Sequence, residues 1–338
     1  MAPVYRAIAK RNQLRPILVS TGQQRSLLVD ALNSFELTPD LDLAVMTADQ
    51  ELGVTTAKIL EGCTKAFADI RPDIVLTQGD TTTAFAAGLA AFYQRVPVGH
   101  VEAGLRTYNW DNPFPEEANR QLVDRLSTWC FAPTQTCVEH LLSERIEAER
   151  ILVTGNTGID ALRWILERQP LPENQDPFVL LTLHRRESFG QWLAQILDGV
   201  TDFLDAIPEA RIIWPVHPNP NVQLMAKQRF GKRRQVNLVP PADYPTFARL
   251  MADCRFILTD SGGVQEEAPS LGKRSLVARD ETERPEGIAS GHNQLVGRNR
   301  ADVARALIES WREPPILDPA NPFGDGQAAD RIAAALVR

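Results

Sequence analysis

Residues 73–107 read DIVLTQGDTTTAFAAGLAAFYQRVPVGHVEAGLRT, and this stretch decides the fold class. Two short apolar runs, at 73–78 and 96–101, stand on either side of an Ala-rich segment with helical spacing. Runs rich in Val, Ile and Leu that are separated by a helix are typical of a βαβ unit, in which two parallel strands are buried on both faces. The stretch therefore predicts a parallel sheet covered by helices.

The same alternation of apolar runs and helical segments extends in both directions along the chain. Further apolar runs of this kind are PILVS (16–20), WCFAP (129–133), ILVTG (151–155), FVLLTL (178–183), RIIWPV (211–216), VNLVP (236–240), RFILTD (255–260) and RSLVA (274–278). Between the two groups of runs, RQPLPENQDP carries three prolines and no apolar period, which is typical of a linker. We expect an α/β protein with two doubly wound halves.

Composition excludes several classes of protein. The 338 residues are 43% hydrophobic, and 36 basic side chains against 43 acidic ones give a net charge of −7. Without a run of five Lys or Arg, the chain offers no electrostatic footprint for a nucleic acid or an anionic membrane. The longest nearly uncharged stretch, 84–93, is shorter than the ~20 apolar residues of a membrane span. Four scattered cysteines without a C-x-x-C pair indicate thiols in a reducing cytoplasm rather than a disulfide framework or a zinc knuckle.

Acidic side chains follow the strands of the first half. Asp80 comes after the run at 73–78, Glu102 comes after the run at 96–101, and Glu116 stands in NPFPEEANR. Ligands of open parallel sheets bind beyond the carboxyl ends of the strands, so we expect these acids to converge there. Asp80 has an alternative interpretation as a helix N-cap. Glu102 is harder to explain structurally, because an unpaired carboxylate in an apolar stretch is costly.

Donors and cations follow the strands of the second half. His184 and Arg185 come after one strand, and His217 comes after the next. The segment Ser261-Gly262-Gly263 opens a helix, where glycine permits close backbone approach and the first N–H groups can face a phosphate. As alternatives, Asp260 or Ser261 only caps this helix, and Arg185 is solvated or paired with a neighbouring acid.

Two acids inside the same helix, Glu266 and Glu267, would repel a phosphate but suit the diol of a ribose. Together with Arg284 in a polar loop of the same half, they indicate a nucleoside diphosphate as the ligand. His140 and His292 stand in surface-like surroundings and are not expected to act.

The longer strings resemble one known family. GDTTTAFAAGLAAFYQRVPVGHVEAGLRT, NPFPEEANR, LTLHRRESFG, PVHPNPNV, LTDSGGVQEEAPSLGK and RDETERPEG are similar to motifs of the non-hydrolysing UDP-N-acetylglucosamine 2-epimerases. The similarity runs over essentially the whole chain, from MAPV to NPFGDGQAADRI.

The resemblance implies the glycosyltransferase B architecture, in which two Rossmann-like domains face a cleft and the C-terminal helix returns to the first domain. The expected domains are 1–167 with 318–338, carrying the catalytic acids, and 168–317, binding UDP. The family epimerises carbon 2 of UDP-N-acetylglucosamine, giving UDP-N-acetylmannosamine, by elimination and re-addition of UDP. The resemblance implies no metal and no nicotinamide or other cofactor, a cytoplasmic homodimer, and a role in supplying sugars for cell-surface polysaccharide.

Family roles carry over residue by residue. The implied catalytic residues are Asp80, Glu102, Glu116 and His184. The implied UDP-binding residues are Arg185, His217, Phe247, Ser261, Gly262, Gly263, Glu267 and Arg284. A Q-H-R segment that binds a second, activating UDP-N-acetylglucosamine corresponds to Gln23, Gln24 and Arg25, where Gln replaces His.

One departure concerns the start of the chain. Family members begin with a strand and a G-T-R-P-E type turn whose Arg reaches the nucleotide, and this sequence starts just after that turn. We expect that the start codon is assigned too late, because the downstream motifs are intact; truncation and a degenerate copy are the alternatives. The rival functions are a catalytically impaired or non-catalytic UDP-sugar-binding homologue and a glycosyltransferase of the same architecture.

Overall fold

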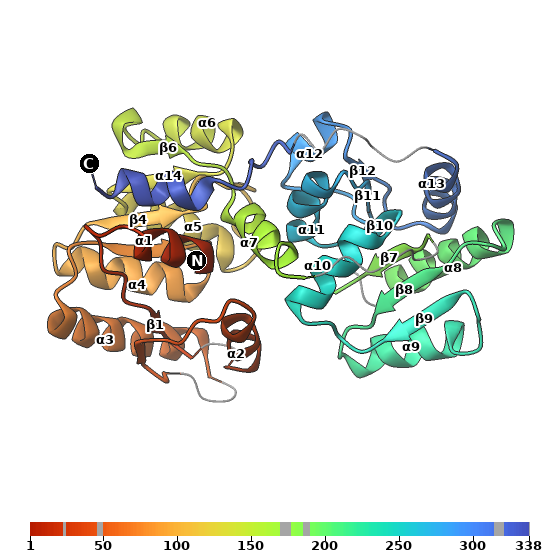
Figure 1. Ribbon diagram of the computed structural model, residues 1–338, viewed down its shortest axis with the longest axis horizontal. Coiled ribbons are helices and arrows are strands. Elements are labelled where there is room, and N and C mark those ends of the chain that lie inside the picture. The colour runs from red at the N-terminus through yellow and green to blue at the C-terminus, as the bar shows by residue number, and fades with distance from the viewer. Residues whose placement is uncertain (23–24, 46–49, 170–176, 185–189, 314–320, 338) are drawn as a thin grey trace. The chain divides into compact units, whose positions relative to one another are not determined.

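The computed structural model describes residues 1–337 apart from 23–24, 46–49, 170–176, 185–189 and 314–320; the side chains of 25–28 are also outside the described part. The chain divides into two compact units (Figure 1). We call Met1–Ala161 with Gly324–Arg338 the N-terminal unit, and Leu162–Phe323 the C-terminal unit.

The N-terminal unit holds two parallel sheets. Strands β3, β4, β5 and β6 pair in that order, and β1 pairs with β2 in a separate two-stranded sheet. The elements are α1 (Ala2–Ala9), β1 (Val19–Ser20), α2 (Arg25–Ser34), β2 (Leu41–Asp42), α3 (Leu52–Ile70), β3 (Val75–Gln78), α4 (Thr82–Tyr93), β4 (Val98–Val101), α5 (Glu116–Leu126), β5 (Trp129–Ala132), α6 (Gln135–Ser143), η1 (Ala148–Arg150), β6 (Ile151–Val153) and α14 (Ala328–Ala335). Helix α7 (Thr157–Leu166) crosses the boundary between the two units.

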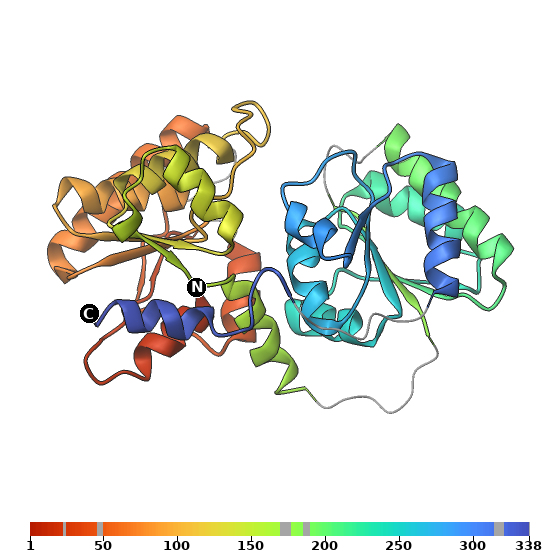
Figure 2. The ribbon, with the colours of Figure 1, turned by 90° about the horizontal axis from the view of Figure 1, so that it is seen from above.

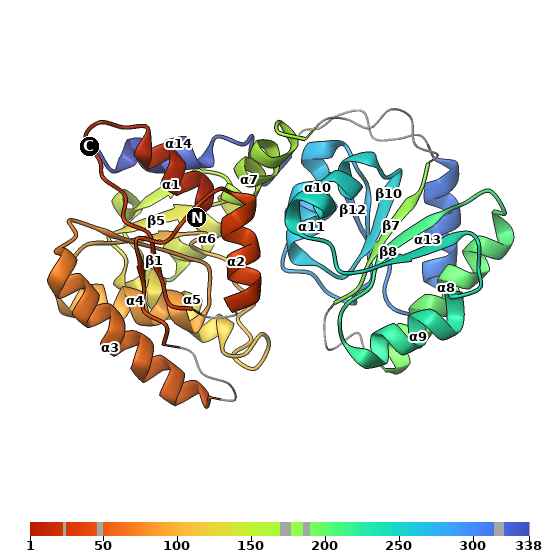
Figure 3. The same cartoon turned by 60° about the horizontal axis from the view of Figure 1, so that its bottom comes forward.

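Helices cover both faces of the four-stranded sheet, as Figure 3 shows for α3 and α4 on one side and α1 and α14 on the other. Val75 and Val98 pack with Ile59 of α3 in one core cluster. Val101 and Phe131 pack in another cluster with the apolar faces of α1 and α14. The C-terminal helix therefore docks on the first helix of the chain.

The C-terminal unit is a six-stranded parallel sheet in the order β12-β11-β10-β7-β8-β9. Its elements are β7 (Val179–Thr182), α8 (Gln191–Ala206), β8 (Ile212–Pro215), α9 (Pro220–Phe230), β9 (Val236–Val239), α10 (Tyr244–Asp253), β10 (Phe256–Thr259), α11 (Gly262–Glu267), η3 (Ala268–Leu271), β11 (Ser275–Val277), α12 (Pro285–Ala289), β12 (Asn293–Leu295) and α13 (Arg300–Arg312). The chain builds outward from β7 in one direction and from β10 in the other, so the topological switch point lies between these two strands.

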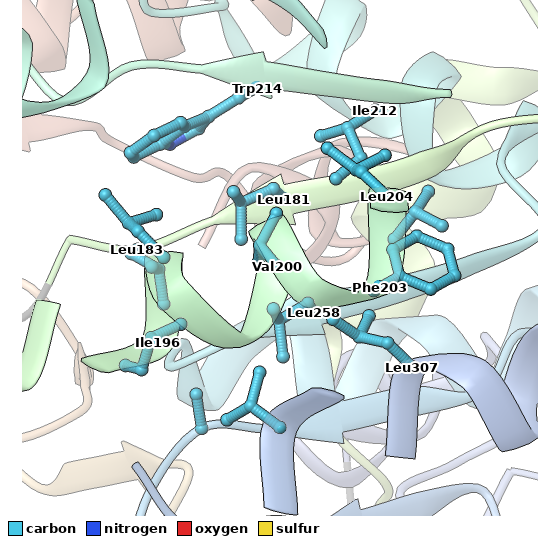
Figure 4. Close-up of a cluster of buried hydrophobic side chains, with 14 of the residues drawn as sticks. Leu181, Leu183, Ile196, Val200, Phe203, Leu204, Ile212, Trp214, Leu258 and Leu307 are labelled. Atoms are coloured by element: carbon cyan, nitrogen blue, oxygen red, sulfur yellow. The ribbon is translucent and has the colours of Figure 1, made fainter. Parts of the chain in front are cut away.

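Alternate residues of the strands build the core of the C-terminal unit. Leu181 and Leu183 of the β7 region and Trp214 of β8 point toward α8 (Figure 4). Helix α8 buries Leu193, Ile196, Leu197, Val200, Phe203 and Leu204. This spacing of three and four residues is that of an amphipathic helix on a sheet. Figure 2 shows the sheet between α8 and α13 on one side and α10 to α12 on the other.

The expected strands are present, although each is shorter than its apolar run. Two strands were not expected from the sequence, β2 and β12, both of only two or three residues. All four cysteines are buried and none of these described residues forms a disulfide, as expected. Across the described ranges, we find no helix with the length and apolar character needed to cross a membrane.

Candidate active site

The loop that follows β3 presents Asp80. Gly79 turns the chain with φ +72°, a conformation that suits glycine. Thr81 is the N-cap of α4, because its Oγ1 accepts from the backbone N–H of Ala84 at 3.2 Å. The interpretation of Asp80 as the N-cap is therefore wrong. Its carboxylate, 30% exposed, instead receives a hydrogen bond from the guanidinium of Arg120.

Helix α5 holds the Asp80 loop and starts with Glu116. Asn119 Nδ2 donates to the backbone carbonyl of Asp80 at 2.9 Å. Arg120, which donates to the Asp80 carboxylate, also lies 3.4 Å from Glu117 Oε2. Glu116 itself is half-buried at the first position of the helix. The side chains of one helical turn thus connect the loop of Asp80 to the helix end that carries Glu116.

Glu117, next to Glu116, is fully buried and has a structural role. Its carboxylate accepts from the backbone N–H groups of Thr107 and Tyr108, both at 3.0 Å, and from Gln121 at 2.7 Å. Burial raises the pKa of Glu117, but these hydrogen bonds and the charge of Arg120 outweigh it and hold the pKa below its ordinary value. Glu117 fixes the loop that leads into Glu116.

Glu102 follows β4 in an unusual conformation. Its φ is +72°, in the left-handed region that costs an L-residue about 1–2 kcal/mol. Its backbone N–H donates to the carbonyl of Phe131 at 3.1 Å, and Gln78 Nε2 lies 3.5 Å from its Oε2. A strained residue that the surrounding structure holds in place is a feature of functional sites. Gln78 also connects the end of β3 to the carboxylate at the end of β4.

A buried ionic cluster lies beneath these loops. His100 of β4 contacts Asp124 of α5 through Nδ1 at 2.5 Å. Asp124 Oδ2 lies 2.8 Å from Arg106, and Arg106 makes a bidentate pair with Glu144 at 2.7 and 2.8 Å. The side chains of His100, Asp124 and Arg106 are fully shielded from solvent. The sequence analysis did not identify Arg106, Arg120 or Asp124, although Arg106 and Arg120 stand within the motifs that resemble the family.

In the C-terminal unit, two strand-end loops meet at the switch point. Asp260, fully buried after β10, accepts the backbone N–H of His184 after β7 at 3.0 and 3.2 Å. The imidazole of His184 remains 46% exposed, with Nε2 3.9 Å from Asp260 Oδ1. Asp260 thus fixes the start of the His184 loop rather than capping α11.

Arg284 packs against the start of α11. A Cβ built on Gly262 would lie 2.7 Å from Arg284 Cζ, so glycine at this position lets the guanidinium lie against the start of α11. Arg284 Nε donates to Glu266 at 2.7 Å and Nη1 donates to Glu283 at 3.1 Å. Glu266, expected to suit a ribose, is therefore engaged by Arg284. Ser261 occupies the N-cap position of α11 but makes no side-chain cap hydrogen bond, so the capping interpretation of Ser261 is wrong.

Glu267 pairs with a residue that sequence reasoning missed. Tyr244 Oη donates to Glu267 Oε1 at 3.1 Å. Burial, together with the neighbouring Glu266, raises the pKa of Glu267 to about 8. Phe247, one helical turn after Tyr244 on α10, is half-buried. No sequence motif singled out Tyr244.

The remaining predicted residues are placed as follows. His217 accepts the backbone N–H of Asn219 on Nδ1 at 3.1 Å, which leaves its proton on Nε2. Gly263 follows Gly262 in α11 and is exposed. Gln23, Gln24 and Arg185 lie outside the described residues, and Arg25 begins α2 without a described side chain.

Two further histidines were expected on the surface. His292 is buried, with its Nδ1 3.1 Å from Ser290 Oγ, so this expectation is wrong for His292. His140 is half-buried, and its Nδ1 lies 2.9 Å from the carbonyl of Gly104.

Comparison with known proteins covers the whole chain. A family model described as UDP-N-acetylglucosamine 2-epimerase matches residues 6–337. The UDP-N-acetylglucosamine 2-epimerase of Salmonella typhimurium is 45% identical over 354 residues, covering 99% of this chain and 94% of that protein. The crystal structure of the Neisseria meningitidis UDP-GlcNAc 2-epimerase bound to UDP-GlcNAc superposes with a TM-score of 0.91 at 40% identity, covering 100% of this chain and 95% of that one. A Methanocaldococcus jannaschii UDP-GlcNAc 2-epimerase in complex with UDP-GlcNAc and UDP gives 0.84 at 33% identity, covering 99% and 95%. The chain belongs to the UDP-N-acetylglucosamine 2-epimerase family, whose members have two Rossmann-like domains.

Proposed function

We propose that this protein interconverts UDP-N-acetylglucosamine and UDP-N-acetylmannosamine. In the forward direction a base takes the proton from carbon 2, the bond between carbon 1 and the UDP oxygen breaks, and a double bond forms between carbons 1 and 2. UDP then adds back to carbon 1 while a proton is delivered to the other face of carbon 2. No other reactant is consumed.

The observation that carries this proposal is the set of three acids at one edge of the N-terminal sheet. Asp80 and Glu102 follow neighbouring strands, and Arg120 with Asn119 connects the Asp80 loop to the start of α5 at Glu116. Positioned carboxylates are suited to remove and return a proton, which accelerates such a step by roughly 10²–10⁴-fold. We assign the proton transfers to Asp80, Glu102 and Glu116.

The C-terminal unit supplies what the leaving group requires. Charge grows on the diphosphate as the bond to carbon 1 breaks, and preorganised donors and cations stabilise such a charge. We assign His184, His217 and Arg284 to this role, together with Ser261, Gly262 and Gly263. Arg185 is assigned to the same role from the resemblance of its motif. Glu267 and Phe247 are assigned to the nucleoside.

One assay tests the proposal against its rivals. The purified protein is incubated with UDP-N-acetylglucosamine alone and the products are separated. An epimerase forms the manno isomer without an acceptor. A glycosyltransferase of the same architecture would need an acceptor, and a binding protein would retain UDP-N-acetylglucosamine in equilibrium dialysis without converting it. Absence of the manno isomer would overturn the proposed function.

We also propose that the protein acts as a cytoplasmic homodimer that supplies N-acetylmannosamine-type sugars for polysaccharide. The dimer and the pathway are what the resemblance to this family implies, and the similarity extends over the whole chain. The four buried thiols suit a reducing compartment. Light scattering at the concentration of the assay measures the molar mass, and a value matching one chain would refute the dimer.

A further inference from the structure

His100 is placed where both of its ring nitrogens meet an acceptor. Nδ1 lies 2.5 Å from Asp124 Oδ1, and Nε2 lies 2.8 Å from the backbone carbonyl of Gly79. A neutral imidazole carries one N–H and could satisfy only one of these acceptors. Because the ring is fully buried, an unsatisfied polar atom would be costly. The ring is therefore an imidazolium that donates in both directions.

The surroundings compensate this charge. Four charged groups form the cluster, His100 and Arg106 as cations and Asp124 and Glu144 as anions. Glu102 is the other charged group that acts on His100. Burial lowers the pKa of His100, but Asp124, the Gly79 carbonyl and Glu102 together outweigh it and raise the pKa above its ordinary value.

The two ends of this arrangement reach both acid-bearing loops of the sheet. Gly79, whose carbonyl accepts from His100, is the residue before Asp80. Asp124, on the other side of the ring, accepts the backbone N–H of Gly104 through Oδ2 at 3.2 Å. Gly104 is two residues after Glu102. One charged pair therefore spans the loop of Asp80 and the loop of Glu102.

We propose that His100 and Asp124 act as positioning residues, forming a clamp that fixes the Asp80 loop relative to the Glu102 loop for proton transfer at carbon 2. This rests on the proposed function. Neither residue touches the substrate, because both side chains are fully buried. The clamp acts through backbone atoms at Gly79 and Gly104, so its effect is on the geometry of the acids. A misplacement of about 1 Å at a reacting centre can cost on the order of 10²-fold in rate.

Two substitutions of one residue separate positioning from mere stability. In His100→Gln the amide nitrogen can occupy the place of Nε2 and keep the hydrogen bond to Gly79. In His100→Asn the amide lies nearer the place of Nδ1, toward Asp124, and the bond to Gly79 is lost. Both variants remove the same charge. We expect His100→Gln to have a kcat about tenfold or more above that of His100→Asn.

Three further measurements complete the test. UDP affinity, a property assigned to the C-terminal unit, should be the same in both variants as in the wild type. His292→Asn, a buried histidine of the C-terminal unit outside the assigned site, should leave kcat unchanged and serves as the control. In the background of Asp80→Asn, His100→Asn should lower kcat by less than about twofold, because a group that acts through Asp80 has nothing further to position.

The possible outcomes are separable. Equal kcat in the Gln and Asn variants, or a full additional loss in the Asp80→Asn background, would overturn the clamp while leaving the epimerase standing. A wild-type protein without epimerase activity would overturn the proposed function itself. Should His100→Asn fail to fold, nitrogen-15 NMR of the histidines in the wild type still decides the matter. Two ring N–H groups on His100 at pH 7 are expected, and a neutral ring would refute the clamp.

Discussion

The strand-end loops of the two units are supported in different ways. In the N-terminal unit, the loops of Asp80 and Glu102 rest on a buried ionic cluster to which helix α5 supplies Asp124, and Arg120 of the same helix contacts the Asp80 carboxylate. In the C-terminal unit, the same edge of the sheet lies above a continuous apolar core, and its charged groups form a chain, Arg279–Glu283–Arg284–Glu266, that keeps partial contact with solvent.

The difference matches the two tasks proposed for the units. Proton transfer requires carboxylates held in a fixed orientation, and charged neighbours provide that orientation at a desolvation cost that only a satisfied network can offset. Binding a diphosphate requires donors at a sheet edge, which an apolar core and a switch point provide without ionic groups that are fully shielded from solvent. We therefore expect substitutions at the site of the N-terminal unit to lower kcat, and substitutions at the site of the C-terminal unit to weaken UDP binding.

The largest effect is expected from the acids. Asp80→Asn, Glu102→Gln and Glu116→Gln each remove a group that can exchange a proton while they keep its shape. Each should lower kcat by roughly 10²–10⁴-fold. UDP affinity, measured by calorimetry, should stay within about twofold of the wild type. An amide variant with nearly normal turnover would remove that acid from the mechanism.

The next largest effect is expected from Arg284, and on binding rather than turnover. Arg284→Met removes a charge-assisted hydrogen bond worth about 1.5–3 kcal/mol, which corresponds to roughly a ten- to hundredfold loss of UDP affinity. Arg279→Met is the control, since Arg279 pairs bidentately with Glu283 in the same loop. Equal losses of UDP affinity in both variants would show that the conformation of this loop, rather than the charge of Arg284, supports binding.

Gly262→Ala tests the role of Arg284 in UDP binding without removing a charge. The added Cβ would lie 2.7 Å from Arg284 Cζ and would force the guanidinium to move, whereas a Cβ on Gly263 meets only Ser261 Oγ at 4.0 Å. We expect Gly262→Ala to weaken UDP binding clearly more than Gly263→Ala does. The two dissociation constants provide the measurement, and the reverse order would contradict the placement of Arg284.

A smaller effect on kcat is expected from Arg120→Lys. Lysine keeps the charge but lacks the planar fork that lets Arg120 face Asp80 and Glu117 together. We expect kcat to fall about tenfold with UDP affinity unchanged. Arg125→Lys on the same helix, where Arg125 donates only to the carbonyl of Glu144 in an exposed position, should have little effect. A comparable loss in both variants would indicate general damage to α5.

The last prediction concerns folding stability rather than kcat or UDP binding, and it is a pH dependence that comes from Glu267. Its pKa is about 8 in the folded protein against about 4.3 in an unfolded chain, so the folded state binds more protons between these values. Glu267 should therefore make the free energy of unfolding fall as the pH rises from about 4.3 to 8. Glu267→Gln should remove this slope and be more stable than the wild type near pH 8. Denaturant titrations across this range provide the measurement, with the exposed Glu281→Gln as control.

The sequence predicted much of the fold because most strands coincide with short apolar runs. Runs such as FVLLTL correspond directly to buried strands like β7. The sequence did not predict β2 and β12, because strands of two or three residues such as Asn293–Leu295 have too few apolar residues to form a recognisable run. Their pairing depends on the neighbouring strand rather than on their own composition.

The candidate site was predicted less completely. Asp80, Glu102 and Ser261 follow predicted strands within two residues. Ligands of parallel sheets bind at these positions, so the sequence alone indicates a functional role for the three residues. Tyr244 and Arg120 stand inside helices, and their partners are distant in the sequence, 23 and 40 residues away. Local spacing cannot reveal such pairs. The hydrogen bonds of His100 likewise reach residues distant in the sequence, Asp124 and Gly79, which are 24 and 21 residues away.

The central claim is that this protein removes and returns a proton at carbon 2 of the sugar. Epimerisation in heavy water, followed by NMR of the hydrogen at carbon 2, tests it most directly. We predict that the manno product, and the gluco substrate recovered at equilibrium, carry deuterium at carbon 2, with incorporation reduced in parallel with kcat in Asp80→Asn. A manno product that keeps its original hydrogen at carbon 2 would contradict exchange with solvent during the reaction.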